Sequence, residues 1–306
     1  MPTISIINYK GGVGKTTLTA NIAAELAQRG MKVLAIDLDA QASLTFSFVQ
    51  PDYWSSKLQH DKTIKQWFDA FGEDSSAPID LESLILKPTA VNARLPKNGG
   101  VLHFIASHLG LINVDLELAT ELNASNLAQA KRKYLKVHRR LIEGLARPAF
   151  ADYDVILIDC PPNFNIVTKT AIIASDQILV PSKADYLSTL GTDYLVGSLR
   201  QLVREHNEYL DQENADLAID PAILGVIFTM VQFYGEQPIS AQRPFIAQTE
   251  KLGLYVFDSY FRDTKTKLAN AAADNVPLIL DGYASTEEVI DELRRLVDEV
   301  VTRAGL

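Results

Sequence analysis

The sequence of 306 residues predicts an α/β protein with a single doubly wound, mostly parallel sheet and helices on both of its faces. Runs of strand length recur along the chain, and helical patterns lie between most of them. The runs are mostly apolar, which is typical of strands that are buried on both faces of a parallel sheet. With 47% hydrophobic residues, the chain can also bury a substantial core. We therefore expect one domain over residues 1–306.

The predicted strands and helices alternate along most of the chain. We expect strands at Thr3–Asn8, Lys32–Asp37, Val101–Ile105, Asp154–Asp159, Gln177–Val180 and Ala222–Thr229. Helices are expected at Thr16–Arg29, Leu109–Leu122, Leu127–Leu145, Ile166–Ala174, Ser188–Leu210, Ser240–Leu252, Thr264–Asp274 and Ser285–Ala304. Residues 52–100 form the least regular region and contain several prolines, so we interpret them as a surface excursion between the second and third strands. The C-terminal helices, at about 264–304, are expected to pack on the core.

The loop after the first strand carries the most specific motif of the chain, Lys10-Gly11-Gly12-Val13-Gly14-Lys15-Thr16-Thr17. Closely spaced glycines let successive backbone N–H groups converge on phosphate oxygens, and the following helix adds its positive N-terminal end. Lys15 can reach the terminal phosphates, and the Thr16 hydroxyl can ligate Mg²⁺. The motif therefore predicts a nucleotide site that is formed by residues Lys10 to Thr17.

One position of this loop departs from the usual phosphate-loop pattern. Tyr9 stands where the pattern requires glycine, and a second lysine, Lys10, stands at the entrance of the loop. These residues resemble the deviant Walker A loop, KGGVGKTT, of the ParA/MinD family of ATPases. The resemblance implies an ATP-bound homodimer in which Lys10 reaches across the interface to the partner's nucleotide, so Lys10 and Lys15 are both expected to be catalytic. The plainer alternative is that Lys10 is a solvated loop residue.

Two carboxylates, Asp37 and Asp39, close the second strand. Residues two apart project to the same side of an extended segment, so both could organise Mg²⁺ and water beside the phosphate loop. The segment resembles the DxDxQ motif of the family, which implies that Asp39 is needed for hydrolysis and that Asp37 supports metal-bound water. Ala40 stands where the family usually has proline, a change that we expect to affect loop stiffness more than chemistry. The alternative is two solvated aspartates at a strand end.

A second acidic strand end follows at Tyr153–Asp159. This is the Walker B arrangement, in which Asp159 would bind Mg²⁺ through water, so Thr16, Asp39 and Asp159 form the predicted metal site. Pro161 and Pro162 prevent an immediate helix, and the turn at Asn163–Asn165 can respond to the γ-phosphate, as the resemblance to the family's switch II implies.

Ser182-Lys183-Ala184-Asp185 looks like the SKxD motif with which GTPases read guanine. ParA-like sequences have no base-reading role at this place, so we expect ATP rather than GTP. The resemblance places the adenine near the segment that follows the Ile223–Thr229 strand, without identifying its contacts.

Composition limits the function classes. One cysteine, Cys160, rules out an intrachain disulfide and fits a reducing compartment. The longest charge-free stretches, Asn98–Val114 and Pro221–Gly235, are shorter than the about 20 apolar residues that span a bilayer. The N-terminus enters a strand at once, which argues against a signal peptide, so a cytoplasmic location is expected. The net charge of −9 argues against a protein surface that is basic enough overall to wrap nucleic acid, but it does not exclude a local basic patch.

Two outputs are considered for this type of ATPase. A MinD-like protein ends in a basic amphipathic helix that enters the membrane, but the last helix here has an acidic polar face, so no membrane binding is expected. A ParA-like protein binds DNA nonspecifically as a dimer. The predicted DNA contacts are Arg262, Lys265 and Lys267, with Lys251 and Arg243 as weaker additions. A second basic cluster lies on a helix whose other face holds Leu127, Tyr134, Leu141 and Leu145, and it comprises Lys131, Arg132, Lys133, Lys136, Arg139 and Arg140. For both clusters, an ordinary solvated face is the alternative.

The resemblance covers essentially the whole chain and is strongest over Thr3–Thr45 and Tyr153–Asn165. It implies a Soj-like ParA ATPase that hydrolyses ATP slowly and, stimulated by a ParB-like or adaptor protein, partitions a plasmid or chromosome on the nucleoid. No DNA-reading extension is expected before the first strand. The alternative within the family is McdA-like or ParC-like positioning of a protein assembly. A biosynthetic or nitrogenase-reductase-like relative is a third interpretation, and a lone Cys160 cannot supply the paired cysteines of a cluster-bearing reductase.

Overall fold

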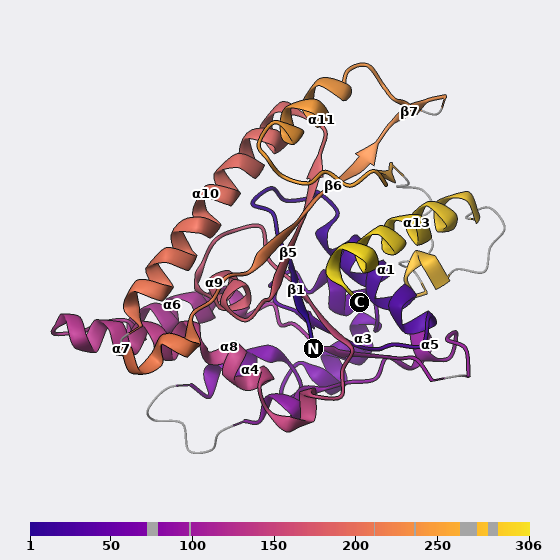
Figure 1. The fold of residues 1–306 in the computed structure, drawn as a ribbon. Helices are drawn as coiled ribbons and strands as arrows, with labels where there is room; N and C mark the ends of the chain where they lie inside the picture. Colours follow the sequence, from indigo (N-terminus) through magenta and orange to yellow (C-terminus); the bar gives the residue numbers. More distant parts are fainter. Residues whose placement is uncertain (72–78, 98, 211, 236, 264–273, 281–286) are drawn as a thin grey trace.

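The structure is a computed structural model, and it describes residues 1–71, 79–97, 99–210, 212–235, 237–263, 274–280 and 287–306. Seven strands form one sheet in the order β3-β2-β4-β1-β5-β6-β9, and every neighbouring pair is parallel (Figure 1). The strands are β1 (Thr3–Ile6), β2 (Lys32–Asp37), β3 (Val101–Ile105), β4 (Val155–Asp159), β5 (Gln177–Lys183), β6 (Ala222–Val231) and β9 (Phe261–Arg262). The predicted fold class is confirmed.

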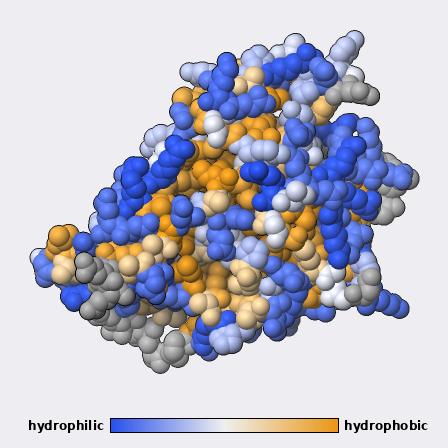
Figure 2. Space-filling model, viewed as in Figure 1, coloured by the Kyte–Doolittle hydropathy of each residue, from blue (hydrophilic) through white to orange (hydrophobic). Residues whose placement is uncertain are grey.

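Helices cover both faces of the sheet, and each face has its own apolar core. One face is covered by α1 (Lys15–Gln28), α2 (Ser43–Phe46), α5 (Thr89–Asn92) and α13 (Glu287–Ala304). The other face is covered by α4 (Ile64–Asp69), α6 (Leu111–Glu121), α7 (Leu127–His138), α8 (Arg140–Leu145), α9 (Ile166–Ile173), α10 (Tyr186–Tyr209) and α11 (Arg243–Glu250). Figure 2 shows hydrophobic residues gathered between α10 and the strands.

Short elements complete the described chain. They are α3 (Pro51–Tyr53), the π-helical turn η1 (Trp54–Leu58), the 3₁₀ turns η2 (Leu81–Leu84), η3 (Pro148–Phe150), η4 (Gln212–Leu217) and η5 (Leu278–Leu280), and the antiparallel pair β7 (Phe233–Tyr234) and β8 (Gln237–Pro238). None of the helices in the described ranges is long and apolar enough to cross a membrane.

The strand order places the candidate site. Strand β1 lies between β4 and β5, and the chain passes from β1 to β2 in one half of the sheet and from β5 to β6 in the other half. Ligands of open parallel sheets bind at such a switch point, beyond the carboxyl ends of the strands. The register sets Asp37 of β2 opposite Asp159 of β4, and Ile6 of β1 opposite the same Asp159. The phosphate loop and both acidic strand ends therefore meet at one edge.

The structure differs from the sequence predictions in several elements. The predicted helix at Leu127–Leu145 is divided into α7 and α8 at Arg139. The short edge strand β9 was not predicted, and part of the region at 52–100 forms short helical elements. The backbone groups of Leu86 in that region also pair with those of Phe104 at the edge of the sheet, at 2.8 and 2.9 Å. The predicted helix at Thr264–Asp274 lies, except for Asp274, outside the described residues.

Candidate nucleotide site

The phosphate loop is fixed to the strands on either side of it. The Asn8 side-chain amide donates to the Pro181 carbonyl of β5 at 2.7 Å, and the Thr229 hydroxyl of β6 donates to the Val13 carbonyl at 2.8 Å. Gly12 and Gly14 have φ values of 66° and 81°, a region that favours glycine, so the glycines are required by the shape of the loop. These contacts hold the loop to β5 and β6.

Lys15 points back into its own loop. Its ammonium donates to the carbonyl oxygens of Asn8 and Lys10, at 3.2 and 3.3 Å, and the residue is 6% exposed. Burial lowers the pKa of Lys15, and Asp159 and Asp39 oppose this effect. A Cβ atom added to Gly11 or Gly12 would meet no other atom within 4 Å, so the backbone of the loop is open at these two positions. This arrangement fits a phosphate chain.

Thr16 and Asp159 come together at the start of α1. The Thr16 hydroxyl donates to a carboxylate oxygen of Asp159 at 2.6 Å, and Asp159 is fully buried. Burial raises the pKa of Asp159 well above its usual value, and the nearby Asp37 raises it further, whereas Thr16 and Lys15 lower it. A buried carboxylate beside a hydroxyl is a set of hard oxygen donors of the kind that Mg²⁺ prefers.

The remaining carboxylates have separate environments. Asp37 is buried and accepts hydrogen bonds from the Thr45 N–H and hydroxyl, at 2.8 and 2.7 Å, and burial raises its pKa to about 7. Asp39 is half-buried, and one of its carboxylate oxygens accepts the Gln41 N–H at 2.9 Å. Within the described ranges, no group of three acidic, histidine or cysteine side chains could hold a metal alone. Carboxylate and hydroxyl oxygens such as those of Asp159 and Thr16 are ligands that Mg²⁺ binds together with phosphates and water.

Two residues that support this acidic loop were missed by the sequence reasoning. Thr45 binds Asp37, and its hydroxyl also accepts the Ser107 N–H at 2.8 Å, just beyond β3. The Ser107 hydroxyl donates to the Asp39 carbonyl at 2.6 Å. Serine and threonine in loops are too common to signal such a role, because only the folded sheet brings residue 107 beside residues 39 and 45.

Lys10 leaves the loop in the opposite direction from Lys15. Its ammonium lies 2.9 and 2.8 Å from the two carboxylate oxygens of Asp185 and 2.9 Å from the Ser188 hydroxyl, both at the start of α10. The Lys10 and Asp185 side chains are 32% and 42% exposed. Lys10 is thus a partly exposed, paired residue rather than a freely solvated one.

Tyr9, the departure from the usual loop pattern, connects three elements. Its ring lies 5.6 Å from Phe164 in the loop after β4 and 5.5 Å from Tyr194 of α10, measured between ring centroids. In the same loop, Asn165 caps α9 by accepting the Thr168 N–H at 2.9 Å. The phosphate loop, the loop after Asp159 and the long helix α10 therefore contact one another directly.

Comparisons with known proteins agree with this geometry. A family model described as an AAA domain matches residues 1–212. The chain is 29% identical to the sporulation initiation inhibitor protein Soj of Bacillus subtilis over 289 residues, which are 90% of each chain. It is also 29% identical to the chromosome partitioning protein ParA of Myxococcus xanthus over 227 residues, 74% of this chain and 64% of that protein. The chain belongs to the ParA branch of the ParA/MinD ATPases.

A solved relative shares the fold of this ParA-type ATPase. A variant of Cyanothece McdA in complex with ATP superposes with a TM-score of 0.67 at 22% identity, and the match covers 98% of this chain and 96% of that one. At this identity the likeness shows the fold alone.

The predicted DNA cluster is only partly described in this ParA-type ATPase. Arg262 pairs with Glu292 of α13, with a 2.7 Å hydrogen bond from its Nε, and lies 3.1 Å from the Glu288 carboxylate. Arg243 and Lys251 are exposed, and Arg243 donates to the Pro238 carbonyl at 2.7 Å. The other two predicted contacts, Lys265 and Lys267, lie outside the described residues. The role of the cluster stays a prediction.

Two members of the second basic cluster, Arg139 and Arg140, form contacts within the fold. The Arg140 guanidinium stacks 4.0 Å from the Trp67 ring centroid, and burial lowers its pKa to about 9. Arg139 is 6% exposed and donates to the Leu217 carbonyl at 2.8 Å. Leu127, which the sequence places on the other face of this helix, is 70% exposed. Arg139 and Arg140 do not form an open basic face.

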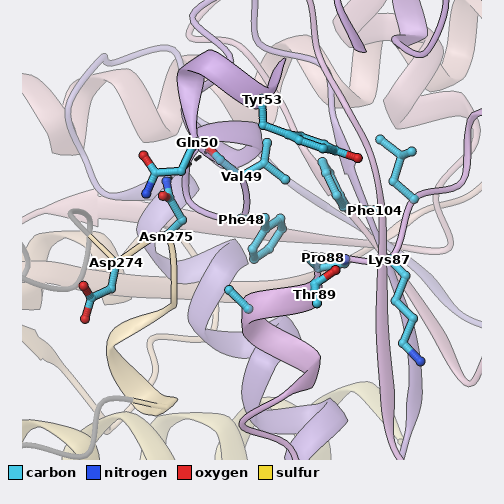
Figure 3. A pocket seen from close by; sticks show the side chains of 12 residues that line it. Phe48, Val49, Gln50, Tyr53, Lys87, Pro88, Thr89, Phe104, Asp274 and Asn275 are labelled. Carbon is cyan, nitrogen blue, oxygen red and sulfur yellow. Dashed lines mark hydrogen bonds between the residues drawn. The ribbon is translucent and has the colours of Figure 1, made fainter. Parts of the chain in front are cut away.

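A cavity of about 390 Å³ lies beside β3, at the edge of the sheet (Figure 3). Phe48, Tyr53 and Phe104 are among the side chains that line it. Its lining includes no residue of the phosphate loop and none of the acidic strand ends, so the nucleotide chemistry of this ParA-type ATPase does not belong there.

Proposed function

We propose that this ParA-type ATPase is a switch in which ATP and Mg²⁺ close two copies face to face, and hydrolysis lets them separate. The observation that carries the proposal is the different placement of two lysines in one loop. Lys15 is buried against its own loop, whereas Lys10 is partly exposed and points away from it. A lysine that cannot serve its own phosphates from this position is suited to serve those of a second copy.

We propose a role for each predicted residue. The N–H groups of Gly11 to Thr17 and the Lys15 ammonium would hold the phosphates, while Thr16 and Asp159 would hold Mg²⁺, with Asp37 supporting a bound water. Mg²⁺ would neutralise charge that develops on the phosphate oxygens. Asp39 would orient the attacking water, and Lys10 would add positive charge from the second copy in place of an arginine finger. Hydrolysis is expected to be slow until a partner protein completes this arrangement.

The surface around Lys10 supports a second copy as the occupant. Tyr186, Leu187, Leu190 and Tyr194 of α10 are 60%, 66%, 55% and 70% exposed. They lie within about three turns of the helix that begins beside Lys10. Apolar side chains gathered on one surface usually mark an interface.

We propose that the dimer is cytoplasmic and binds the DNA of the nucleoid without sequence specificity. Arg262, Lys265, Lys267, Lys251 and Arg243 would contact phosphates, and a ParB-like or adaptor protein would couple hydrolysis to movement of a plasmid or chromosome. The partitioning proteins among the relatives support this choice. McdA-like or ParC-like positioning of a protein assembly is the alternative, and the shared fold of McdA is compatible with it.

The test is sedimentation of the purified chain with Mg²⁺ and either ADP or a slowly hydrolysed ATP analogue. We expect a dimer with the analogue, a monomer with ADP, and DNA binding by the dimer alone. Lys10→Ala should abolish the dimer, whereas Lys57→Ala, which removes an exposed lysine on η1, should leave it intact. A wild-type chain that stays monomeric with the analogue would overturn the switch. Turnover of GTP in preference to ATP would overturn the choice of nucleotide.

A further inference from the structure

All hydrogen-bond donors of the Lys10 ammonium have acceptors within a single copy of the chain. An ammonium group has three N–H donors. Here three acceptor oxygens lie within 2.9 Å of it, two on Asp185 and one on Ser188. The Lys10 backbone N–H is held separately by the Asn8 side chain at 2.9 Å. In this state, Lys10 has no donor left for a phosphate, although the loop around it is already formed.

The acceptor of this pair is stabilised whether or not Lys10 is present. Asp185 is the N-cap of α10, and one of its oxygens accepts the Ser188 N–H at 2.8 Å. Burial raises the pKa of Asp185, but its hydrogen bonds from Lys10 and Ser188 lower it below the usual value. If Lys10 departs, the carboxylate keeps its cap bond and the positive end of the helix. Loss of the lysine therefore leaves no orphaned buried charge.

The pair is also weak enough to exchange. Both side chains are about one third or more exposed, and ion pairs in such positions contribute little because water competes with them. A triphosphate carries more negative charge than one carboxylate and would lie in a site from which a second copy excludes water. The balance therefore favours Asp185 in the single copy and phosphate in a closed dimer.

We propose that Asp185, with Ser188, is a positioning residue that holds Lys10 in cis in the monomer, and that closure on ATP exchanges this carboxylate for the phosphates of the partner's nucleotide. The inference rests on the proposed switch. It gives a role to the Ser182–Asp185 motif, whose aspartate binds lysine rather than guanine. The exchange opposes dimerisation by the strength of the cis pair, so the pair weakens association of a chain without ATP.

The experiment compares Asp185→Asn with wild type by sedimentation with Mg²⁺ and a slowly hydrolysed ATP analogue. Asparagine keeps the helix cap but removes the charge that holds Lys10. Each of the two copies gives up one such pair on closure, and one exposed ion pair is worth about twofold to fivefold, so we expect the dimer dissociation constant to fall about fourfold to 25-fold. The matched control is Glu208→Gln, an exposed acid at the other end of the same helix, which should leave the constant unchanged.

Urea unfolding of Asp185→Asn without nucleotide separates positioning from a structural role. We expect its midpoint to stay close to that of wild type, because asparagine keeps the helix cap. Ser188→Ala removes one acceptor of three, and its smaller shift in the same direction provides the test if Asp185→Asn does not fold. An unchanged or weakened dimer in Asp185→Asn, with a wild-type dimer present, overturns the exchange but leaves the switch. A wild-type chain that never dimerises overturns both.

Discussion

Lys10 and Lys15 occupy one short loop, yet their ammonium groups differ in burial and in the acceptors that they bind. Lys15 is buried against the carbonyls of Asn8 and Lys10, whereas Lys10 reaches α10 at the rim of the site. The sequence predicts Lys15 as a ligand of its own phosphates and, by resemblance, Lys10 as a ligand of the partner's nucleotide. It does not predict that Asp185 binds Lys10 within one copy, because only the fold brings residue 185 beside residue 10.

Asp39 gives the sharpest test at the scale of single residues. Only one of its carboxylate oxygens is hydrogen-bonded within the described part of the chain, so the other is available to orient water. We expect Asp39→Ala to reduce ATP hydrolysis about 100-fold or more while leaving nucleotide binding within about threefold of wild type, because the alanine removes only a group that acts on water. Binding is measured with a fluorescent ATP analogue, and turnover by phosphate release.

The control for this substitution is Asp61→Ala, which removes an exposed aspartate outside the site. Retained hydrolysis in Asp39→Ala would show that another group orients the water. A joint loss of binding and hydrolysis would instead assign Asp39 to holding the nucleotide and its metal.

At the scale of elements, a buried histidine lies at the junction of α7 and α8. His138 ends α7, is 1% exposed, and stacks on Tyr134 with ring centroids 4.1 Å apart. Its Nδ1 lies 3.0 Å from the Tyr134 carbonyl, and Lys169 and His206 face it from neighbouring helices. Burial lowers the pKa of His138 to about 4, and the two basic neighbours contribute in the same direction.

This shift predicts acid sensitivity of the fold. The pKa of histidine in an unfolded chain is about 6.5. Between pH 6.5 and about pH 4, His138 therefore binds a proton in the unfolded chain but stays neutral in the folded chain. Stability due to His138 is therefore present above about pH 6.5 and is lost as the pH falls. We expect His138 to account for about 2 kcal/mol of the decrease in unfolding free energy between pH 7 and pH 5, measured by urea denaturation. His138→Gln should flatten the profile by this amount.

The matched variant is His60→Gln, which alters an exposed histidine and should leave the pH profile as in wild type. An equally steep profile in His138→Gln and wild type would show that other groups cause the acid sensitivity.

The elements also show which features can be predicted from the chain. Strands β1, β2 and β4 and the loop of Lys10 to Thr17 depend on local sequence, and local patterns predict them. The short strand β9 and the break at Arg139 depend on tertiary contacts, so periodicity misses them. Likewise, Thr45, Ser107 and Asp185 reach the site only because the parallel sheet collects loops from distant parts of the sequence at one edge.

For the whole molecule, the question is how a chain of net charge −9 would bind DNA. Some of the basic side chains in the predicted clusters form contacts within the fold, since Arg262 pairs with Glu292 of α13 and Arg140 stacks on Trp67. Removing Arg262 would also leave Glu292 without its guanidinium partner, so an effect on DNA could not be separated from one on packing. Exposed cations such as Lys251 are therefore the more informative positions.

Lys251 gives the last prediction. It is exposed at the end of α11, and a phosphate bound there would release counterions. We expect Lys251→Ala to weaken DNA binding by the ATP-bound dimer equally for different sequences, and to reduce the slope of log affinity against log salt by about 1, the value for one phosphate that is no longer neutralised. Arg200→Ala is the control, because Arg200 is exposed on α10 and lies outside the predicted cluster. If Arg200→Ala lowers affinity and slope while Lys251→Ala leaves both unchanged, the DNA surface lies on α10 and not near α11.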